Sequence, residues 1–150
     1  FRCDCLVPES GTGGIRHPKF FFFDVGVLNG LLDNFKASSD RIGYLFEHLV
    51  FNQLKASAAS KDVSIEIGFF RTAAGFEVDF LVRLRGELWA IECKSGQVNS
   101  QDAQPLLALE SYFPEVKRRI IVTPKEENRA IGNGKVQVMG LNRLLKQMDL

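Results

Sequence analysis

Acidic side chains and a lysine gather near the ends of two neighbouring segments of alternating sequence. The first segment, 76–84, carries Glu77 and Asp79, and the second, 87–94, carries Glu92 and Lys94. Carboxylate oxygens are the ligands that Mg²⁺ prefers, and an ammonium group beside them can hold a water molecule or stabilise negative charge developing on phosphorus. These residue types therefore indicate a divalent-metal site that acts on a phosphate ester.

The register of the two segments decides whether the acids can share one ion. Both segments alternate apolar and polar residues, which predicts two β-strands joined by a turn at residues 85–86. Counting back from a symmetric two-residue turn places Asp79 opposite Glu92 and Glu77 opposite Lys94. Directly opposed residues have Cβ atoms about 4.5–5.5 Å apart, and two facing carboxylates weaken a sheet by repulsion. A hard cation between Asp79 and Glu92 would make this arrangement favourable.

Strand alternation also predicts which side chains share a face of the sheet. We expect the apolar residues of the first strand on the face opposite to its acids, namely Phe76, Val78, Phe80 and Val82. In the second strand, Glu92 and Lys94 share a face with Leu88 and Ala90, while Trp89, Ile91 and Cys93 take the other.

The elements that must position these residues follow from hydrophobic periodicity and from turn residues. In chain order we expect an irregular start over residues 1–18, a short buried strand or extended segment at 20–24, a helical turn or two at 27–32, a helix at 41–58, strands at 63–71, 76–84 and 87–94, a helix within 100–113, a strand at 119–123, a polar loop at 125–134, a strand at 136–139 and a short helix at 141–148. This order predicts an α/β domain with a mixed central sheet flanked by helices on both faces.

The helix predicted at 41–58 brings a further acid toward the site. Glu47 lies one turn before Val50 and Phe51, on a face that should be largely buried. His48 falls on the polar stripe of the same helix, with Asn52, and we expect it to face solvent.

Composition and chain ends limit the other functions. The chain has 150 residues, 45% of them hydrophobic, which suits one domain, and its net charge of +1 does not by itself indicate nucleic-acid binding. Three cysteines form no disulfide framework, which favours a reducing, cytoplasmic compartment, and no apolar run is long enough to cross a membrane. The sequence begins at Phe1 rather than at Met, so we expect a fragment of a longer protein, with an irregular linker at 1–14 and a single domain at 15–150.

A second interpretation of the charged cluster stays open at this point. Charged side chains on a hairpin are commonly solvated residues of its open face. Three features argue against it: the strands are apolar, a facing acid pair is a poor choice for a solvent face, and Glu47 brings another acid onto an apolar helix face.

Four motifs together resemble a known nuclease superfamily. They are Gly43-Tyr44-Leu45-Phe46-Glu47, Phe69-Phe70-Arg71, Glu77-Val78-Asp79-Phe80 and Ile91-Glu92-Cys93-Lys94-Ser95. The set resembles the PD-(D/E)xK superfamily, archaeal Holliday-junction resolvases in particular. With the segment 18–28, PKFFFFDVGVL, it is similar over roughly residues 15–145 to the DUF4143 domain, which is found at the C-terminus of many prokaryotic AAA-type ATPases.

The resemblance implies a restriction-endonuclease-like fold with the core order αβββαβ, and a role for each residue. Asp79 and Glu92 would ligate Mg²⁺ or Mn²⁺ with the Cys93 carbonyl, Glu47 would complete the site from the helix, and Lys94 would position or activate the nucleophilic water. It further implies that Glu77 supports the ligands and that Arg71 contacts phosphate. Gln101 or Gln104, on the second helix, is a candidate to approach the substrate.

The resemblance implies metal-dependent hydrolysis of DNA, with the ATPase part of a longer chain as a partner. Two alternatives remain open from the sequence. The chain could be a non-catalytic module that binds nucleic acid or protein for that ATPase, or a structural domain that forms a homo-oligomer.

Overall fold

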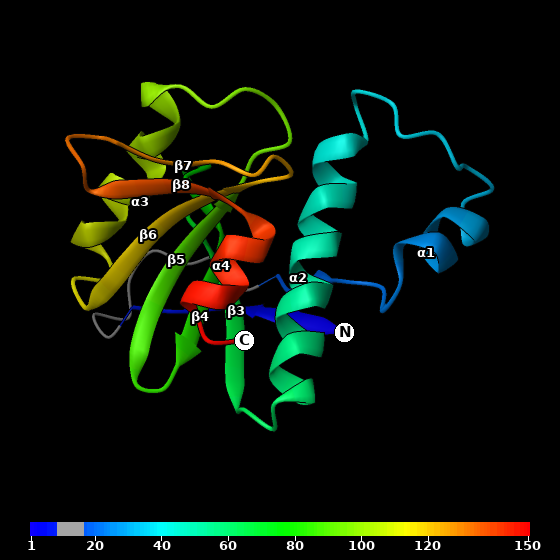
Figure 1. Cartoon of the computed structure of the whole chain (residues 1–150), viewed down its shortest axis with the longest axis horizontal. Helices are drawn as coiled ribbons and strands as arrows, with labels where there is room; N and C mark the ends of the chain where they lie inside the picture. Colours follow the sequence, from blue (N-terminus) through cyan, green and yellow to red (C-terminus); the bar gives the residue numbers. More distant parts are fainter. Residues whose placement is uncertain (9–16) are drawn as a thin grey trace.

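The computed structural model describes residues 1–8 and 17–150, and over these residues a mixed eight-stranded sheet has helices on both faces (Figure 1). The strands are β1 (Arg2–Cys5), β2 (Lys19–Phe20), β3 (Ile65–Arg71), β4 (Glu77–Leu84), β5 (Glu87–Cys93), β6 (Val116–Thr123), β7 (Asn128–Ile131) and β8 (Val136–Gly140). The helices are α1 (Val25–Leu31), α2 (Ile42–Ser60), α3 (Gln104–Ala108) and α4 (Leu141–Gln147), and the 3₁₀ helices η1 (Ser100–Ala103) and η2 (Leu109–Ser111) flank α3. The predicted α/β class and mixed sheet are confirmed.

The strand order is β2-β1-β3-β4-β5-β6-β8-β7. Short turns join β3, β4 and β5 into an antiparallel meander, whereas η1, α3 and η2 carry the chain back so that β6 pairs in parallel with β5. The order α2, β3, β4, β5, α3, β6 matches the predicted sequence of elements.

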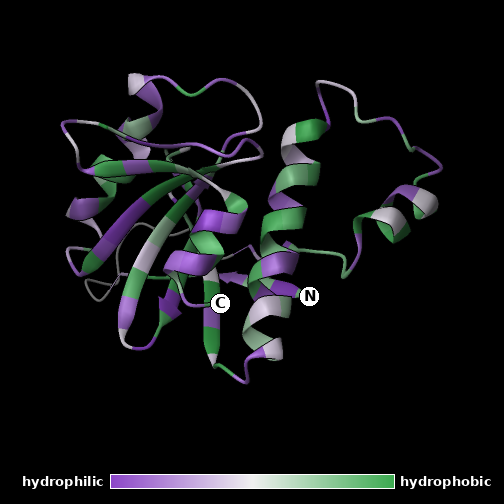
Figure 2. Cartoon of the chain, viewed as in Figure 1, coloured by the Kyte–Doolittle hydropathy of each residue, from purple (hydrophilic) through white to green (hydrophobic). Residues whose placement is uncertain are grey.

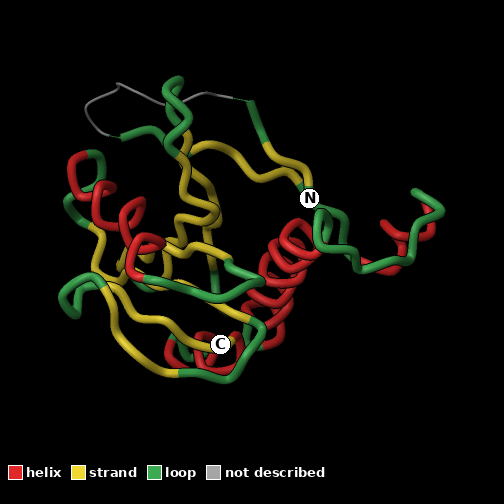
Figure 3. Tube along the Cα trace, turned by 90° about the horizontal axis from the view of Figure 1, so that it is seen from above, coloured by secondary structure: helices red, strands yellow, loops and turns green. Residues whose placement is uncertain are grey.

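Two apolar layers cover the two faces of the sheet. On one face α2 and α4 pack on a phenylalanine-rich layer, in which the rings of Phe21 and Phe51 stack at 4.2 Å and both contact Phe80. On the other face η1, α3 and η2 cover a layer that contains Phe70 and Phe113. Figure 2 shows the hydrophobic colour along the central strands and along much of α2, and Figure 3 shows α2 and α3 on opposite sides of the strands.

The hairpin of β4 and β5 has the predicted register. Leu84 pairs with Glu87 and Phe80 with Ile91, and one further step places Asp79 opposite Glu92. The turn residues Arg85 and Gly86 have φ of 48° and 79°, and such left-handed conformations at both central positions give the turn the twist that a two-residue hairpin requires.

A β-bulge changes the predicted faces of β4. Between the pairs Gly68–Leu81 and Phe70–Val78, β3 advances by two residues while β4 advances by three. Val78 therefore packs with Phe70 in one layer, while Phe80 packs in the other. The expectation that Val78 and Phe80 share a face is wrong, because strict alternation fails at a bulge.

The beginning of the chain is more ordered than predicted. The irregular start expected over 1–18, linker 1–14 included, is wrong for residues 2–5, which form β1 and pair in parallel with β3. Gly11, Gly13 and the rest of 9–16, including the boundary at residue 15, lie outside the described residues. The segment expected at 20–24 as a buried strand or extended segment is a strand only at Lys19–Phe20, and the expectation that it is buried is wrong except at Phe21.

Two other elements complete the comparison. The polar loop expected at 125–134 contains the edge strand β7, which pairs with β8. The helical turns expected at 27–32 are confirmed as α1, which lies beyond α2 and away from the sheet (Figure 1). No helix among the described residues is both long enough and apolar enough to cross a membrane.

We predict that Gly68→Ala weakens the attachment of β1 to the sheet. A Cβ atom at Gly68 would lie 2.5 Å from Leu6 Cγ and 2.9 Å from the Asp4 carbonyl oxygen. Residues 4–6, at the end of β1, would therefore have to move away from β3. Overpacking of this kind costs about 1–3 kcal/mol. Chemical denaturation would measure the loss of unfolding free energy.

Gly96→Ala is the matched control for this substitution. A Cβ atom at Gly96 meets nothing within 4 Å, so its unfolding free energy should stay within about 0.5 kcal/mol of the wild type. Equal stability of both variants would contradict the tight packing of β1 on β3.

Candidate functional site

Asp79 lies in the bulge of β4 and points toward the end of β5. Its Oδ2 atom accepts a hydrogen bond of 2.8 Å from the Cys93 backbone N–H, and its Oδ1 atom lies 4.0 Å from Lys19 Nζ. The bulge and the bond to β5 fix the direction of this carboxylate. Asp79 is therefore prepositioned, as the hairpin register predicts.

Glu92 lies on β5 opposite Asp79 and is the most deeply buried acid of the site. Only 9% of the residue is exposed. Its Oε1 atom lies 3.2 Å from Lys94 Nζ, while Oε2 is buried without a hydrogen-bond partner among the described residues. A buried acceptor without a partner costs about 1–3 kcal/mol, and more if it is charged. The Glu92 carboxyl group therefore favours a bound cation or a proton.

The pKa values of the facing acids reflect this burial. Burial and the Asp79 charge raise the pKa of Glu92 from 4.5 to about 7, against the opposing effect of Lys94. Burial and the Glu47 charge raise the pKa of Asp79 from 3.8 to about 6, although the Cys93 N–H and Lys19 favour its ionised form. Ionising both acids near neutral pH is therefore costly without an added positive charge.

Lys19 brings the remaining acids together. Its Nζ atom lies 2.6 Å from Glu77 Oε1 and 2.9 Å from Glu47 Oε1, and it stands 5.2 Å from the centre of the Phe69 ring. Burial disfavours the charge on Lys19, but Glu47 and Glu77 outweigh it and hold its pKa above the ordinary value. Lys19 is not among the predicted site residues, because in the sequence it only precedes a run of phenylalanines.

Glu47 reaches the cluster from α2 as predicted, on the face of the helix that packs on the sheet. Burial raises the pKa of Glu47, and the neighbouring Lys19 acts in the opposite direction. The neighbouring His48 is buried, with its ring 4.8 Å from that of Phe21. The expectation that His48 faces solvent is wrong, because the segment after β2 covers the stripe of α2 that looked polar.

Lys94 lies between two acids. Besides Glu92, its Nζ atom is 3.8 Å from Asp102 Oδ1. Asp102 belongs to η1, where its other oxygen accepts a hydrogen bond from the Asn99 N–H in a capping box. Asp102 is also absent from the predicted site, although the spacing Asn99-x-x-Asp102 is a recognisable helix-start signal.

The remaining predicted residues lie at the margin of the site. Arg71 is half exposed, with its Nε atom 3.5 Å from Glu77 Oε2. Gln101 lies exposed on η1, where its backbone N–H donates to the Asn99 side chain and its carbonyl accepts from the Gln104 N–H. Cys93 contributes its N–H to Asp79, and its thiol is reduced, with burial holding the pKa of that thiol well above its ordinary value.

The acids fit a divalent ion in part. Among the described residues, no three side chains of Asp, Glu, His or Cys are arranged so that they could hold a metal ion together. The Glu47 carboxylate pairs with Lys19 at 2.9 Å, so in this arrangement it does not form a three-residue metal group with Asp79 and Glu92. The facing pair nevertheless matches the needs of Mg²⁺, which commonly takes one or two carboxylates and completes its shell with water. The unpartnered Glu92 oxygen supports this fit.

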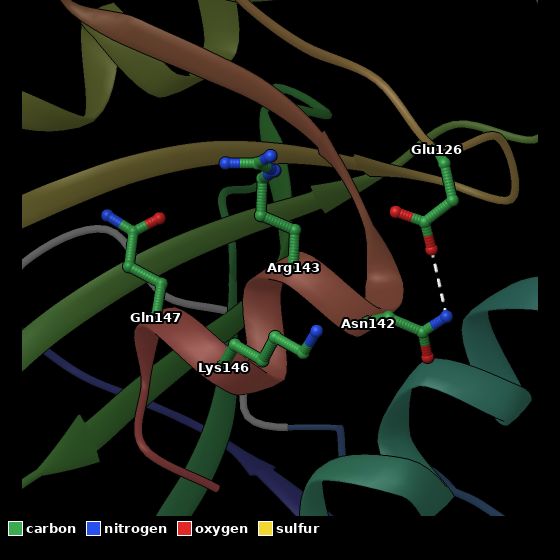
Figure 4. Close-up of a pocket in the computed structure, with 5 residues that line it drawn as sticks. All are labelled: Glu126, Asn142, Arg143, Lys146 and Gln147. Atoms are coloured by element: carbon green, nitrogen blue, oxygen red, sulfur yellow. Dashed lines mark hydrogen bonds between the residues drawn. The ribbon is translucent and has the colours of Figure 1, made fainter.

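Neither of two hollows on the surface is lined by the facing acids Asp79 and Glu92. A large hollow of about 620 Å³ lies over α4, where the Glu126 carboxylate already accepts a 2.8 Å hydrogen bond from Asn142 (Figure 4). A smaller one of about 240 Å³ borders the cluster at Lys19 and Glu47. We place the candidate site at the acids, because the chemistry of the α4 hollow includes no facing carboxylates.

Comparison with known families gives one match. Residues 42–144, more than half of the chain, match the family model described as "Domain of unknown function (DUF4143)". The matched range includes Glu47, Asp79, Glu92 and Lys94 and begins after Lys19. No curated protein matches the chain significantly.

We predict that Glu92→Gln changes how stability depends on pH. Because the pKa of Glu92 rises from 4.5 to about 7 on folding, the folded state binds the proton more tightly, so wild-type stability falls as pH rises through this window. In metal-free buffer the variant should gain roughly 1–3 kcal/mol relative to the wild type between pH 4.5 and pH 8. Urea denaturation at both pH values would measure this.

Glu66→Gln provides the control for this measurement. Glu66 lies on β3 with 59% of its side chain exposed, so its removal should leave the pH dependence of stability unchanged. Parallel pH profiles for wild type and Glu92→Gln would contradict the costly burial of the Glu92 charge.

Proposed function

The chain belongs to the DUF4143 family, a domain of unknown function, and from that premise we propose that it is a divalent-metal-dependent nuclease that hydrolyses DNA phosphodiesters. The observation that carries the proposal is the buried Glu92 carboxylate, with one oxygen unpartnered among the described residues, opposite Asp79 and beside Lys94. A structural salt bridge between Glu92 and Lys94 would not need a second acid, Asp79, opposite Glu92. A metal site does.

The order of elements supports a restriction-endonuclease-like fold of the PD-(D/E)xK type. The segment from α2 through β3, β4, β5 and α3 to β6 follows the αβββαβ order of that superfamily. Asp79 near the start of β4 and the Glu92-x-Lys94 tripeptide at the end of β5 occupy matching places. Since folds host many functions, the proposal rests on the acids rather than on the fold.

In the proposed site Asp79 and Glu92 would hold Mg²⁺ or Mn²⁺, and the Cys93 carbonyl would be a further oxygen donor. A divalent ion bound there would lower the pKa of a coordinated water and polarise the phosphate. The hydrogen bond from the Cys93 N–H keeps one Asp79 oxygen directed at β5, which leaves the other free to turn toward a ligand.

Lys94 acts in its charged form. Burial disfavours its charge, but Glu92 and Asp102 hold the pKa of Lys94 above the ordinary value, so it does not lose its proton near neutral pH. Lys94 therefore positions the attacking water and stabilises negative charge on the phosphate oxygens, rather than removing a proton.

Substrate contacts lie at the exposed margin of the site. Arg71 is the candidate phosphate contact. Gln101, the candidate substrate contact on η1, directly precedes Asp102, which pairs with Lys94. With a net charge of only +1, the domain needs help to hold a polyanion. We propose that a AAA-type ATPase domain on the same chain, in the cytoplasm, supplies that help.

A second function is favoured by a different surface. Large apolar side chains are exposed around α1, among them Phe20, Phe23, Leu31 and Phe35. Several large exposed apolar side chains in one stretch of the chain make that stretch a candidate interaction surface. The alternative is thus a non-catalytic module that binds nucleic acid or protein for the ATPase, or that forms a homo-oligomer.

We predict Mn²⁺- or Mg²⁺-dependent cleavage of plasmid, branched or single-stranded DNA by the purified chain. Asp79→Asn, Glu92→Gln and Lys94→Met should each lower the cleavage rate by roughly 100-fold or more, since each removes a charge that acts on the transition state. Glu66→Gln, an exposed acid of the neighbouring strand, should cut at the wild-type rate. Cleavage that survives Asp79→Asn would contradict the proposal.

The alternative predicts a different pattern. DNA binding that weakens with salt, is unchanged by Glu92→Gln and occurs without Mn²⁺ affinity in calorimetry would indicate a binding module. A solution mass above 16.8 kDa would indicate the homo-oligomer.

A further inference from the structure

Lys19 reaches the acid cluster from outside the β4–β5 hairpin. It lies on β2, a two-residue strand that pairs only with β1 among the described strands, in the register Cys3–Lys19. Its ammonium meets Glu47 from α2 and Glu77 from β4 within hydrogen-bonding distance, and it lies 4.0 Å from Asp79. Side chains from α2 and β4 thus converge on a single cationic atom that β2 carries.

The surroundings of that atom resemble those of a bound ion. Three carboxylates and the face of the Phe69 ring surround Lys19 Nζ, and only about a quarter of its side chain is exposed. Surface ion pairs gain little, whereas removing one partner of a shielded ion pair is costly because the remaining charges lose their compensation. The ammonium occupies a place that would otherwise need a metal ion or protonated acids.

The net charge of the whole cluster would be balanced by one divalent ion. Among the described residues, the linked carboxylates are Glu47, Glu77, Asp79, Glu92 and Asp102, and the linked cations are Lys19, Arg71 and Lys94. With all of them ionised, two negative charges remain. They are concentrated at the Asp79–Glu92 pair, where one Glu92 oxygen is buried and unpartnered.

We propose that Lys19 is the built-in second cation of this site: a positioning residue that occupies the Glu47–Glu77 side and restricts the site to a single divalent ion at Asp79 and Glu92. The inference rests on the proposed metal site and deepens it. It assigns Glu47 to Lys19 rather than to the metal, and it gives the β1–β2 hairpin a role in the chemistry.

Replacing the lysine tests the assignment directly. Lys19→Met removes the charge but keeps an unbranched side chain of similar size, so three carboxylates lose their shared partner. The wild type should bind a single Mn²⁺ per chain in calorimetry, and Lys19→Met should bind a second ion. Electron paramagnetic resonance should then show the broadening caused by two neighbouring Mn²⁺ ions.

Charge-matched variants separate this role from a merely structural one. Lys19→Arg keeps the positive charge and should restore single-ion binding. Lys19→Met combined with Glu77→Gln removes one charge of each sign and should also return to a single ion. Lys61→Met is the surface control, since Lys61 pairs with the exposed Asp149, and it should bind Mn²⁺ as the wild type does.

The outcomes distinguish failure of this inference from failure of the proposed function. A single ion bound with unchanged affinity by wild type and Lys19→Met would overturn the role of Lys19 and leave the metal site standing. A single ion bound more tightly by Lys19→Met would also overturn it, because Lys19 would then compete for the same position. No Mn²⁺ binding by any variant would overturn the metal site itself.

Loss of folding in Lys19→Met would still be informative. If that variant unfolds without metal, Mn²⁺ should restore its far-ultraviolet circular dichroism, because an ion can replace the missing ammonium. A chain that stays unfolded in Mn²⁺, while Lys19→Arg folds, would overturn the inference.

Discussion

The structure depends on neutralising carboxylates that the fold has removed from water. Glu47, Asp79 and Glu92 approach one another from a helix and two strands, and burial raises the pKa of each. Removing a charge from water costs several kcal/mol unless an opposite charge or a proton compensates it. The proposed metal site would supply this compensation, because a divalent ion between Asp79 and Glu92 offsets the charge of both acids.

The surrounding architecture follows from this constraint. The bulge in β4 directs Asp79 toward β5, and the pairing of β1 with β3 supports the short strand that carries Lys19. On the other side η1 brings Asp102 to Lys94. The peripheral strand β2 thus delivers Lys19 and η1 delivers Asp102, while the hairpin and α2 supply Lys94 and the facing acids. Changes in the peripheral elements can therefore alter the charge balance of the site without touching the acids.

Much of the site could be predicted because it depends on local rules. Strand periodicity and the two-residue turn set the pairing of Asp79 with Glu92, since side chains alternate and a tight turn fixes the register. The apolar periodicity of α2 placed Glu47 on its packed face for the same reason. Both the mixed sheet and the order of its central elements follow from such signals, which act over a few residues.

What the sequence by itself determined is the set of facing acids, because their positions depend on spacing along one hairpin and one helix. Only the tertiary structure decided which cations meet them: Lys19 lies 28 residues before Glu47 in the chain and reaches it through β1, whose pairing with β3 has no local signal. The bulge and the burial of His48 were likewise decided by packing between distant segments, since a face that is polar in the sequence can still be covered once the chain folds.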